Sequence, residues 1–327
     1  MKPAAYLAGG ATIAAAALVV PVPLVSIEPG VAVPVESRVA VEGPADEVNG
    51  DLLLTAVLVE EPSAVDAIVG WLDDDTDVLW RQAVIPQGVD EDEYARAQQD
   101  LFRESAEIAA AVGFRLAGQP VEIVGGGAQV AAVIEGGPAD GRLREGDVIV
   151  AVNGRPARLA SDVAKATART RPGDDVAIDV RRGNEQRRYR IEVDEVSQLG
   201  RPGLGVALRT LDLDVRLPSR VRVDASRIGG PSAGLMLALT LYDVADPGDL
   251  ARGRTIAGTG TIDLAGDVGV VGGVRQKVMA ARRAGAELFL VPQEEAGEAR
   301  DAAGGALHVV AVDTIDDALA ALRGDSR

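Results

Sequence analysis

The chain has 327 residues, a formal net charge of −17 at pH 7 and a hydrophobic fraction of 47%. Length and hydrophobicity predict two or three folded domains. The acidic balance argues against nucleic acid as a partner, because phosphate contacts need basic residues. Cysteine is absent and histidine occurs once, so disulfides, cysteine nucleophiles and metal sites built on thiolates or histidines are excluded. We expect neither a metal nor a cofactor.

The scarcity of histidine and lysine narrows the choice of catalytic chemistry. A Ser-His-Asp triad would need His308, which lies in the apolar run 307–312. That run predicts a strand, so we expect a structural histidine there. Lysine occurs only at Lys2, Lys165 and Lys277, and arginine supplies almost all the remaining positive charge.

Residues 4–26 are nearly uncharged and largely apolar. About 20 apolar residues span a bilayer, so we expect a transmembrane helix that anchors the chain over residues 1–27. Lys2 and the α-amino group precede this stretch. The positive end of such a helix stays in the cytoplasm, which places the rest of the chain outside the cell membrane. A cleaved signal peptide is the alternative.

Residues 28–115 predict an N-terminal α+β region. Short apolar runs at its start indicate strands. Residues 62–72 have the pattern of a helix, and the three adjacent aspartates at 73–75 indicate a solvated bend. Residues 91–112 predict a long amphipathic helix. No catalytic chemistry is indicated in this region.

Residues 116–195 predict a compact, β-rich α+β module. Three short motifs follow one another in it: Pro-Ala at 138–139, Leu-Arg-Glu-Gly-Asp-Val-Ile at 143–149, and Val-Asn-Gly at 152–154. The second motif predicts a strand, and Asn-Gly predicts the turn that ends it. These motifs resemble those of PDZ domains.

The PDZ resemblance implies a peptide ligand. Members of that family bind extended peptide ends by adding a strand to a sheet edge, and a glycine-containing loop takes the terminal carboxylate. Gly118 and the glycines at 125–127 are the candidates for that loop in this sequence. A PDZ fold with an occupied or degenerate groove is the alternative.

Residues 200–323 predict an α/β domain, in which a glycine-rich turn places Ser232 at the start of an apolar helix. Pro231 suits the first helical turn. Ser232 then lies among N–H groups that have no intrahelical partner, at the positive end of the helix dipole. The N–H groups around Ser232 and Ala233 can stabilise a developing oxyanion there. A serine that only caps the helix is the alternative.

Lys277 lies on a second predicted helix, residues 272–285. At 100° per residue, small apolar side chains surround Lys277, and the arginines of the helix fall on the far side. Burial disfavours the ammonium and lowers the pKa of a lysine, and such a lysine can act as a general base, which arginine cannot. The alternative is a lysine whose stem passes the alanines and whose amine reaches water.

Serine with a desolvated lysine is an alternative to the histidine triad. The hypothesis is that neutral Lys277 takes the Ser232 proton as the hydroxyl attacks a peptide carbonyl. An acyl-enzyme forms, and water hydrolyses it. This chemistry uses the polypeptide alone, without a cofactor.

Three motifs follow one another in this last domain: Gly-Pro-Ser-Ala-Gly at 230–234, Gly-Thr-Gly-Thr-Ile at 258–262, and Gly-Gly-Val-Arg-Gln-Lys-Val-Met-Ala-Ala at 272–281. They resemble the proteolytic domain of Lon proteases. Together with the anchor and the PDZ module, they resemble the membrane-anchored, PDZ-containing Lon-type serine proteases of Gram-positive bacteria. The predicted fold is an α/β Lon-type proteolytic domain preceded by a PDZ domain and a transmembrane helix.

The Lon resemblance implies site roles and an assembly. Ser232 is the expected nucleophile, Lys277 the base, and Thr259 the group that hydrogen-bonds the lysine. Polypeptides are the expected substrates, and a homo-oligomeric ring is the expected assembly. The chain departs from the family pattern at one acidic residue. Many Lon enzymes have Asp-Gly before Pro-Ser, whereas this chain has Gly229 and Gly230 there.

A second departure concerns ATP. The chain has no Gly-x-x-x-x-Gly-Lys-[Ser/Thr] phosphate loop, so we expect hydrolysis of unfolded or flexible proteins without an ATP motor of its own. Two alternatives stay open. One is a catalytically idle PDZ scaffold or adaptor, and the other is the proteolytic subunit of an ATP-dependent complex.

Overall fold

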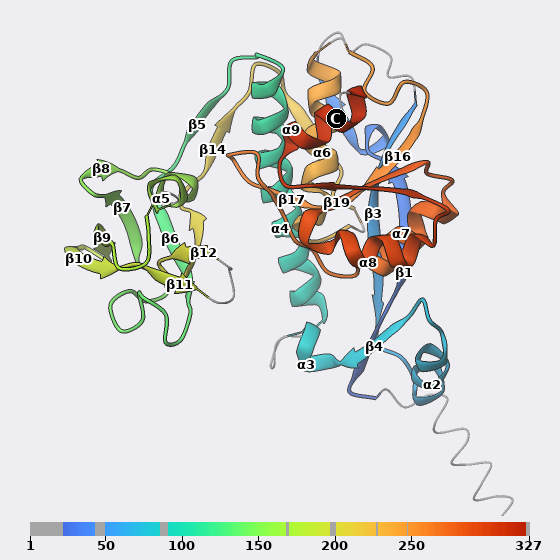
Figure 1. Cartoon of the computed structure of the whole chain (residues 1–327), viewed down its shortest axis with the longest axis horizontal. Helices are drawn as coiled ribbons and strands as arrows, with labels where there is room; N and C mark the ends of the chain where they lie inside the picture. The colour runs from blue at the N-terminus through green and yellow to red at the C-terminus, as the bar shows by residue number, and fades with distance from the viewer. Residues whose placement is uncertain are drawn as a thin grey trace, which may run out of the picture. The chain divides into compact units, whose positions relative to one another are not determined.

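A computed structural model describes residues 22–42, 50–85, 91–167, 170–196, 201–226, 228–246 and 248–324. The chain forms two compact units (Figure 1). Met1–Pro120 and Leu217–Arg327 make up the first, which we call the discontinuous unit, and Val121–Arg216 make up the second, the inserted unit.

A six-stranded sheet forms the centre of the discontinuous unit. Its strand order is β20 (His308–Val312), β19 (Leu288–Pro292), β16 (Thr255–Gly258), β3 (Asp51–Glu60), β1 (Leu24–Pro34) and β4 (Asp77–Trp80). The pairs from β20 to β3 are parallel, and β1 is antiparallel to both of its neighbours. All of β19 is buried, as expected for a parallel strand covered on both faces.

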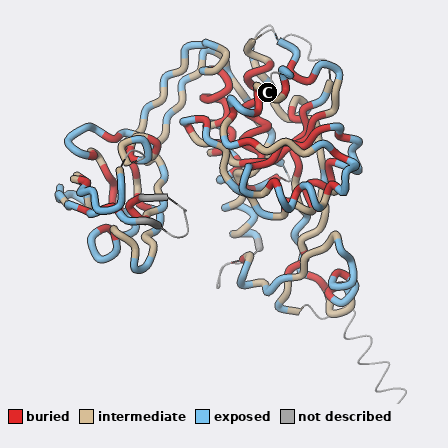
Figure 2. The backbone as a smooth tube through the Cα atoms, viewed as in Figure 1, coloured by how far each residue is buried: buried red, intermediate tan, exposed pale blue. Residues whose placement is uncertain are grey.

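Helices cover both faces of this sheet. Leu52 and Leu54 of β3 point to a core that includes α4 (Glu91–Leu116), α6 (Gly234–Ala245) and α9 (Ile315–Arg323). Leu53 points to the opposite core, with α7 (Val274–Arg283) and α8 (Ala296–Ala303). Successive strand residues face opposite ways, so one Leu-Leu-Leu run contributes to both cores. Figure 2 shows α6 as a buried helix, and Gly234 through Asp243 are all buried.

The smaller elements of the discontinuous unit border this sandwich. They are η1 (Glu36–Arg38), β2 (Val39–Val41) paired with β15 (Val221–Val223), α2 (Ala64–Leu72), α3 (Arg81–Val84), η2 (Pro231–Ala233), β17 (Thr261–Ile262) paired with β18 (Val268–Gly269), and η3 (Gln293–Glu295). The short η2 turn immediately precedes α6 and contains Ser232.

The inserted unit is an antiparallel sheet with one helix. The order is β10 (Glu185–Glu192), β9 (Asp175–Arg182), β7 (Val148–Val152), β6 (Ala128–Val133) and β13 (Val206–Thr210), with β8 (Arg155–Pro156) beside β7. The helix is α5 (Ala160–Thr167). Two ribbons complete the unit: β11 (Asp194–Val196) with β12 (Arg201–Gly203), and β5 (Glu122–Val124) with β14 (Asp214–Arg216).

The structure divides the chain differently from the boundaries expected above. Residues 28–115 do not fold separately, because β3 pairs with β16 and lies between helices supplied from both ends of the chain. The physical reason is the Leu-Leu-Leu run, which needs cover on both faces. Residues 206–216, expected in the last domain, belong to the inserted unit, since β13 extends its sheet through β6.

The expected anchor over residues 1–27 lies almost entirely outside the described residues, which begin at residue 22. Leu24 already starts strand β1. Among the described helices, none is both long and apolar enough to cross a bilayer.

Candidate functional site

The turn that contains Ser232 is fixed by backbone geometry. Gly230 has φ +79°, a conformation that favours glycine, and Pro231 opens the 3₁₀ turn. The Ser232 carbonyl accepts the Gly260 N–H at 2.9 Å, and the Leu235 N–H donates to the Gly260 carbonyl at 3.0 Å. The serine is therefore held against the segment that follows β16.

Ala233 is the last residue of η2 and is 3% exposed. The first N–H groups of a helix lack intrahelical acceptors and carry partial positive charge. Ser232 and Ala233 therefore lie where an oxyanion can be stabilised. A peptide carbonyl bound next to the serine hydroxyl would direct its oxygen to this position.

Lys277 is buried in the apolar side of α7, with 3% of its surface exposed. Val274, Val278 and Ala281 of the same helix are buried with it. Among the described residues, no group accepts a hydrogen bond from its amine or pairs with it. Burial lowers the pKa of Lys277 from 10.5 to about 8, and the charge of Glu295 opposes this shift in part. A substantial neutral fraction therefore exists close to physiological pH.

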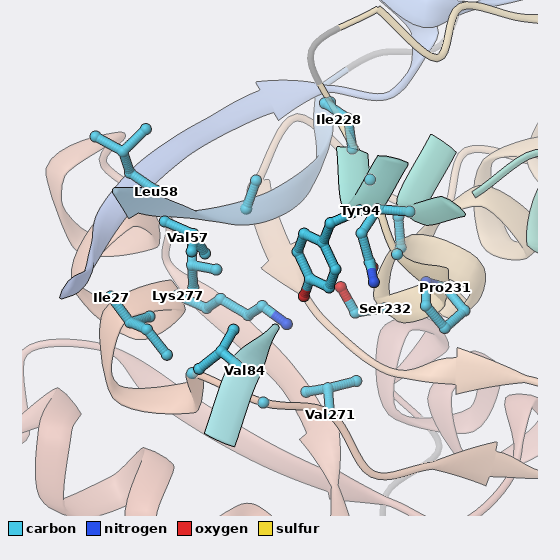
Figure 3. Close-up of a pocket in the computed structure, with 18 of the residues that line it drawn as sticks. Ile27, Val57, Leu58, Val84, Tyr94, Ile228, Pro231, Ser232, Val271 and Lys277 are labelled. Carbon is cyan, nitrogen blue, oxygen red and sulfur yellow. The ribbon is translucent and has the colours of Figure 1, made fainter. Parts of the chain in front are cut away.

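Ser232 and Lys277 line the same cavity, which has a volume of about 1020 Å³. The two residues come from opposite faces of the sheet. They meet beyond Leu54, where the pairing of β3 with β16, which involves residues 51–54 of β3, has ended. In Figure 3 the Lys277 amine and the Ser232 hydroxyl point toward one another, and Tyr94 lines the same cavity. Ligands of parallel sheets commonly bind in such crevices at the carboxyl ends of strands.

Thr259 is completely buried, and its hydroxyl donates to the Ser232 carbonyl at 3.2 Å. The resemblance implied a hydrogen bond to Lys277 instead. In the structure Thr259 directly follows β16, and its N–H donates to the Leu290 carbonyl, so its hydroxyl lies under the serine turn. Thr259 thus positions the backbone of Ser232.

One wall of the cavity is an unpaired strand edge. Beyond Leu54, β3 pairs only with β1 among the described strands. Residues 55–60 line the cavity with their other edge. An open edge offers backbone N–H and C=O groups to an extended peptide.

Two family models match the chain. Residues 212–323 match the Lon protease (S16) C-terminal proteolytic domain, and residues 110–193 match the PDZ domain. The chain contains a Lon-type serine protease domain and a PDZ domain. The motifs that contain Ser232 and Lys277 lie in the part of the discontinuous unit that matches the Lon model. The PDZ match covers most of the inserted unit.

Curated Lon proteases are similar to parts of this chain. Lon protease 3 of Sorangium cellulosum is 30% identical over 55% of this chain and 22% of its own length, and the Lon protease of Magnetococcus marinus is 47% identical over 20% and 8%. The chain therefore spans about a fifth or less of these Lon proteases. A solved PDZ domain of an SdrC-like protein from Listeria monocytogenes is 25% identical and covers 25% of this chain and 87% of its own, with a TM-score of 0.24.

Helix α4 explains how the Lon-type site departs from the family pattern at Gly229. A Cβ at Gly229 would lie 2.7 Å from the Cβ of Gln98, and the Gly230 N–H donates to the Gln98 carbonyl at 2.8 Å. Ser105 of the same helix donates to the Pro231 carbonyl at 3.0 Å. An aspartate at position 229 does not fit while α4 packs there.

Sequence reasoning missed the part that α4 plays in the site. Tyr94, Gln98 and Ser105 contact the cavity or the serine turn. The available signal was Ser105, a polar residue on the apolar side of the predicted amphipathic helix. Its 4% exposure shows that this side is buried against the serine turn.

The structure bears on the glycines named above as candidates for a carboxylate-binding loop of the PDZ domain. The Gly126 and Gly127 N–H groups donate to backbone carbonyls of residues 211 and 158, so neither is available to a ligand. Gly118 lies in the discontinuous unit. Gly118, Gly126 and Gly127 are therefore unsuited to the role, and Gly125 stays a prediction.

The loop at residues 203–205 meets the requirements better. It precedes β13, the last strand of the sheet, whose outer edge has no partner among the described strands. Leu204 and Gly205 accept hydrogen bonds through their carbonyls, and within the described residues their N–H groups find no acceptor. Helix α5 adjoins this edge, since the Ala160 N–H donates to the Thr210 hydroxyl at 3.1 Å. A Gly-Leu-Gly-Val sequence just beyond the expected boundary was the missed signal.

Proposed function

We propose that this protein is a serine endopeptidase that hydrolyses unfolded or flexible proteins, with Ser232 as nucleophile and Lys277 as general base. The observation that carries the proposal is the buried, unpaired amine of Lys277, which points at the Ser232 hydroxyl inside one cavity. The match to the Lon proteolytic domain supports the same assignment.

The proposed reaction uses one proton carrier for both steps. Neutral Lys277 takes the proton of Ser232 Oγ as that oxygen bonds to the peptide carbonyl carbon. The N–H groups of Ser232 and Ala233 stabilise the oxyanion. The C–N bond then breaks, and the Lys277 ammonium gives its proton to the departing amine. Lys277 then deprotonates a water molecule, which attacks the ester carbonyl carbon. The bond to Ser232 Oγ breaks, the product carboxylic acid leaves, and the Lys277 ammonium returns its proton to Ser232 Oγ.

The shape of the cavity favours extended substrates. Its wall is the open edge of β3, with Val57 and Val59 on the lining, so an added peptide strand gains backbone hydrogen bonds and apolar contact. A folded protein seldom offers such a segment. Without a phosphate loop in the chain, hydrolysis proceeds with no nucleotide of its own.

We further propose that the PDZ domain selects substrates by their C-termini, with residues 203–205 binding the carboxylate and β13 pairing with the peptide. A short fluorescent peptide with an apolar C-terminal residue should bind the full chain. Its C-terminally amidated copy should bind at least about tenfold more weakly, because charge-assisted hydrogen bonds contribute about 1.5–3 kcal/mol each. Fluorescence anisotropy measures both. Equal binding of the two peptides would exclude the proposed carboxylate site.

The N-terminal anchor belongs to the proposal as well. Residues 4–21, which precede β1, are uncharged and largely apolar and come close to the length of a single transmembrane span, with the two domains outside the cytoplasm. A homo-oligomeric ring follows from the Lon resemblance. The Lon relatives found are mostly from Gram-negative bacteria, so they give no support to the Gram-positive origin that the resemblance implied.

The test compares cleavage of an unfolded and a folded form of one protein by the full chain in detergent, without nucleotide. We expect cleavage of the unfolded form only, at a rate that ATP does not change. Absence of cleavage under all conditions would favour the idle scaffold. Cleavage only after adding an ATPase partner and ATP would favour the subunit of an ATP-dependent complex.

A further inference from the structure

Helix α2 carries its apolar side on the outside of the molecule. Ile68, Val69, Trp71 and Leu72 are 60%, 60%, 81% and 84% exposed. At 100° per residue they fall within an arc of about 160°. The buried residues of the helix, Ala67 and Gly70, lie opposite.

This exposure does not come from a poorly formed helix. Ser63 and Asp66 form a reciprocal capping box at its N-terminus, and a Cβ at Gly70 would lie 3.0 Å from Thr76 and from Val78. The side of α2 that carries Ala67 and Gly70 is therefore packed closely on Thr76 and Val78, at the start of β4. The four exposed side chains project from a fixed support.

Trp80 of β4, the strand that α2 contacts with its buried side, is also 62% exposed. With Ile68, Val69, Trp71 and Leu72 it forms what we call the α2–β4 patch. The chain has only two tryptophans, and both belong to this patch. Exposed apolar clusters of this kind mark interaction surfaces.

The position of the patch in the chain identifies its partner. Trp80 pairs with Leu24, the first residue of β1, and the apolar N-terminal stretch ends directly before it. Three residues of extended chain span at most about 10 Å. If residues up to about 20 cross a bilayer, the patch lies at the membrane surface, where tryptophan rings are preferentially located.

The charges around the patch define the mode of contact. The helix contains one acidic residue, Asp66, and the loop after it contains Asp73, Asp74 and Asp75. Asp75 is paired with Arg283 at 3.4 Å. Such a surface has no attraction for anionic headgroups, so contact depends on insertion of apolar side chains.

We propose that the α2–β4 patch inserts into the interface of the bilayer that holds the anchor, so that the catalytic unit rests on the membrane. This inference depends on the proposed anchor. Leu58 and Val59, which line the cavity, are further exposed apolar residues of this unit, at 45% and 38%.

The test reconstitutes the full chain into vesicles of phosphatidylcholine and phosphatidylglycerol, with bromine near the top of the acyl chains of part of the lipid. Flotation with the vesicles reports the anchor, and quenching of tryptophan emission by bromine reports the patch, because both tryptophans lie in it. We expect flotation, a blue shift of the emission, and loss of most of its intensity.

A matched pair of variants assigns the signal. Ile68→Ser with Leu72→Ser should float normally but lose most of the blue shift and quenching. Leu101→Ser, at an exposed apolar position of α4, should behave as the unmodified chain. Flotation with unquenched tryptophans would overturn the patch proposal and leave the anchor intact. Failure to float would overturn both. A blue shift without bromine quenching would overturn the proposed membrane insertion and would indicate that a second copy of the chain covers the patch.

Discussion

Replacing Lys277 with methionine should abolish peptide hydrolysis and, in the same molecule, stabilise the fold. Loss of the proposed proton acceptor next to Ser232 should reduce turnover at least about a thousandfold. The stability gain has a separate cause. The folded state keeps a buried ammonium whose pKa is lowered from 10.5 to about 8, and each pKa unit corresponds to about 1.4 kcal/mol. Methionine should therefore raise the free energy of unfolding by up to about 3 kcal/mol at pH 7.

The sign of this effect follows from proton linkage. The folded-state pKa of Lys277 is the lower one, so the unfolded chain binds more protons and stability rises with pH between about 8 and 10.5. The penalty is fully present below pH 8 and absent above 10.5. The gain from Lys277→Met should shrink over that window, as denaturant melts at several pH values will measure.

Three companion variants separate catalysis from stability. Ser232→Ala should lose hydrolysis to the same extent without the gain in stability. Lys277→Arg should be inactive, since arginine stays protonated. Lys165→Met, at an exposed position, should change neither property. Activity close to that of the unmodified chain in Lys277→Arg would rule out proton transfer by this residue.

The second large effect is on the pH dependence of the rate. Only the neutral amine of Lys277 can accept the Ser232 proton, so kcat/KM should rise about tenfold per pH unit below the pKa of about 8 and level off above it. Between pH 6 and pH 8 the neutral fraction increases about fiftyfold. A fluorogenic unfolded peptide assayed across this range gives the profile.

Glu295 provides an internal control for that profile. Its carboxylate oxygens accept the Val271 N–H at 3.1 Å, and its charge raises the pKa of Lys277 against the effect of burial. Glu295→Gln removes the charge but keeps an acceptor, so the rise in rate should move to lower pH. A flat profile in the unmodified chain, or an unmoved one in the variant, would contradict the assignment of Lys277 as the base.

The two helices of the site could be predicted from the sequence. The small residues around Lys277 predicted a buried face, and α7 buries Val274, Lys277 and Ala281 together. The Gly-Pro-Ser turn predicted a serine at a helix start, and η2 precedes α6 there. Both signals are local, since they depend on residues within one or two turns.

Long-range contacts could not be predicted in the same way. The bend at residues 73–75 was expected to be solvated, and Asp73 and Asp74 are exposed. The sequence did not indicate that Asp75 pairs with Arg283 or that Arg275 donates to the Asp74 carbonyl at 3.1 Å. These partners are about 200 residues away in sequence. Gly229 and Gln98, which are also in contact, are about 130 residues apart in the sequence, and no periodicity or turn pattern indicates their contact.

For a related reason, the sequence did not indicate that the N-terminal α+β region, residues 28–115, shares a sheet with the C-terminal part of the chain. The sequence of β3 predicts a buried strand, but it does not indicate that the strand pairs with β16. A parallel neighbour that lies beyond an inserted module leaves no hairpin signal. The insertion becomes visible only through strand pairing.

The β5–β14 ribbon has a consequence for how such proteins diversify. Glu122 and Arg216 are directly paired neighbours, so the chain leaves the discontinuous unit and returns to it at almost the same point. Removing everything between them would require only a short bridging turn, and the parallel strand pairs of the large sheet would stay intact. The PDZ module is in this sense exchangeable, and we expect that a different domain can be grafted at the same junction without refolding the discontinuous unit.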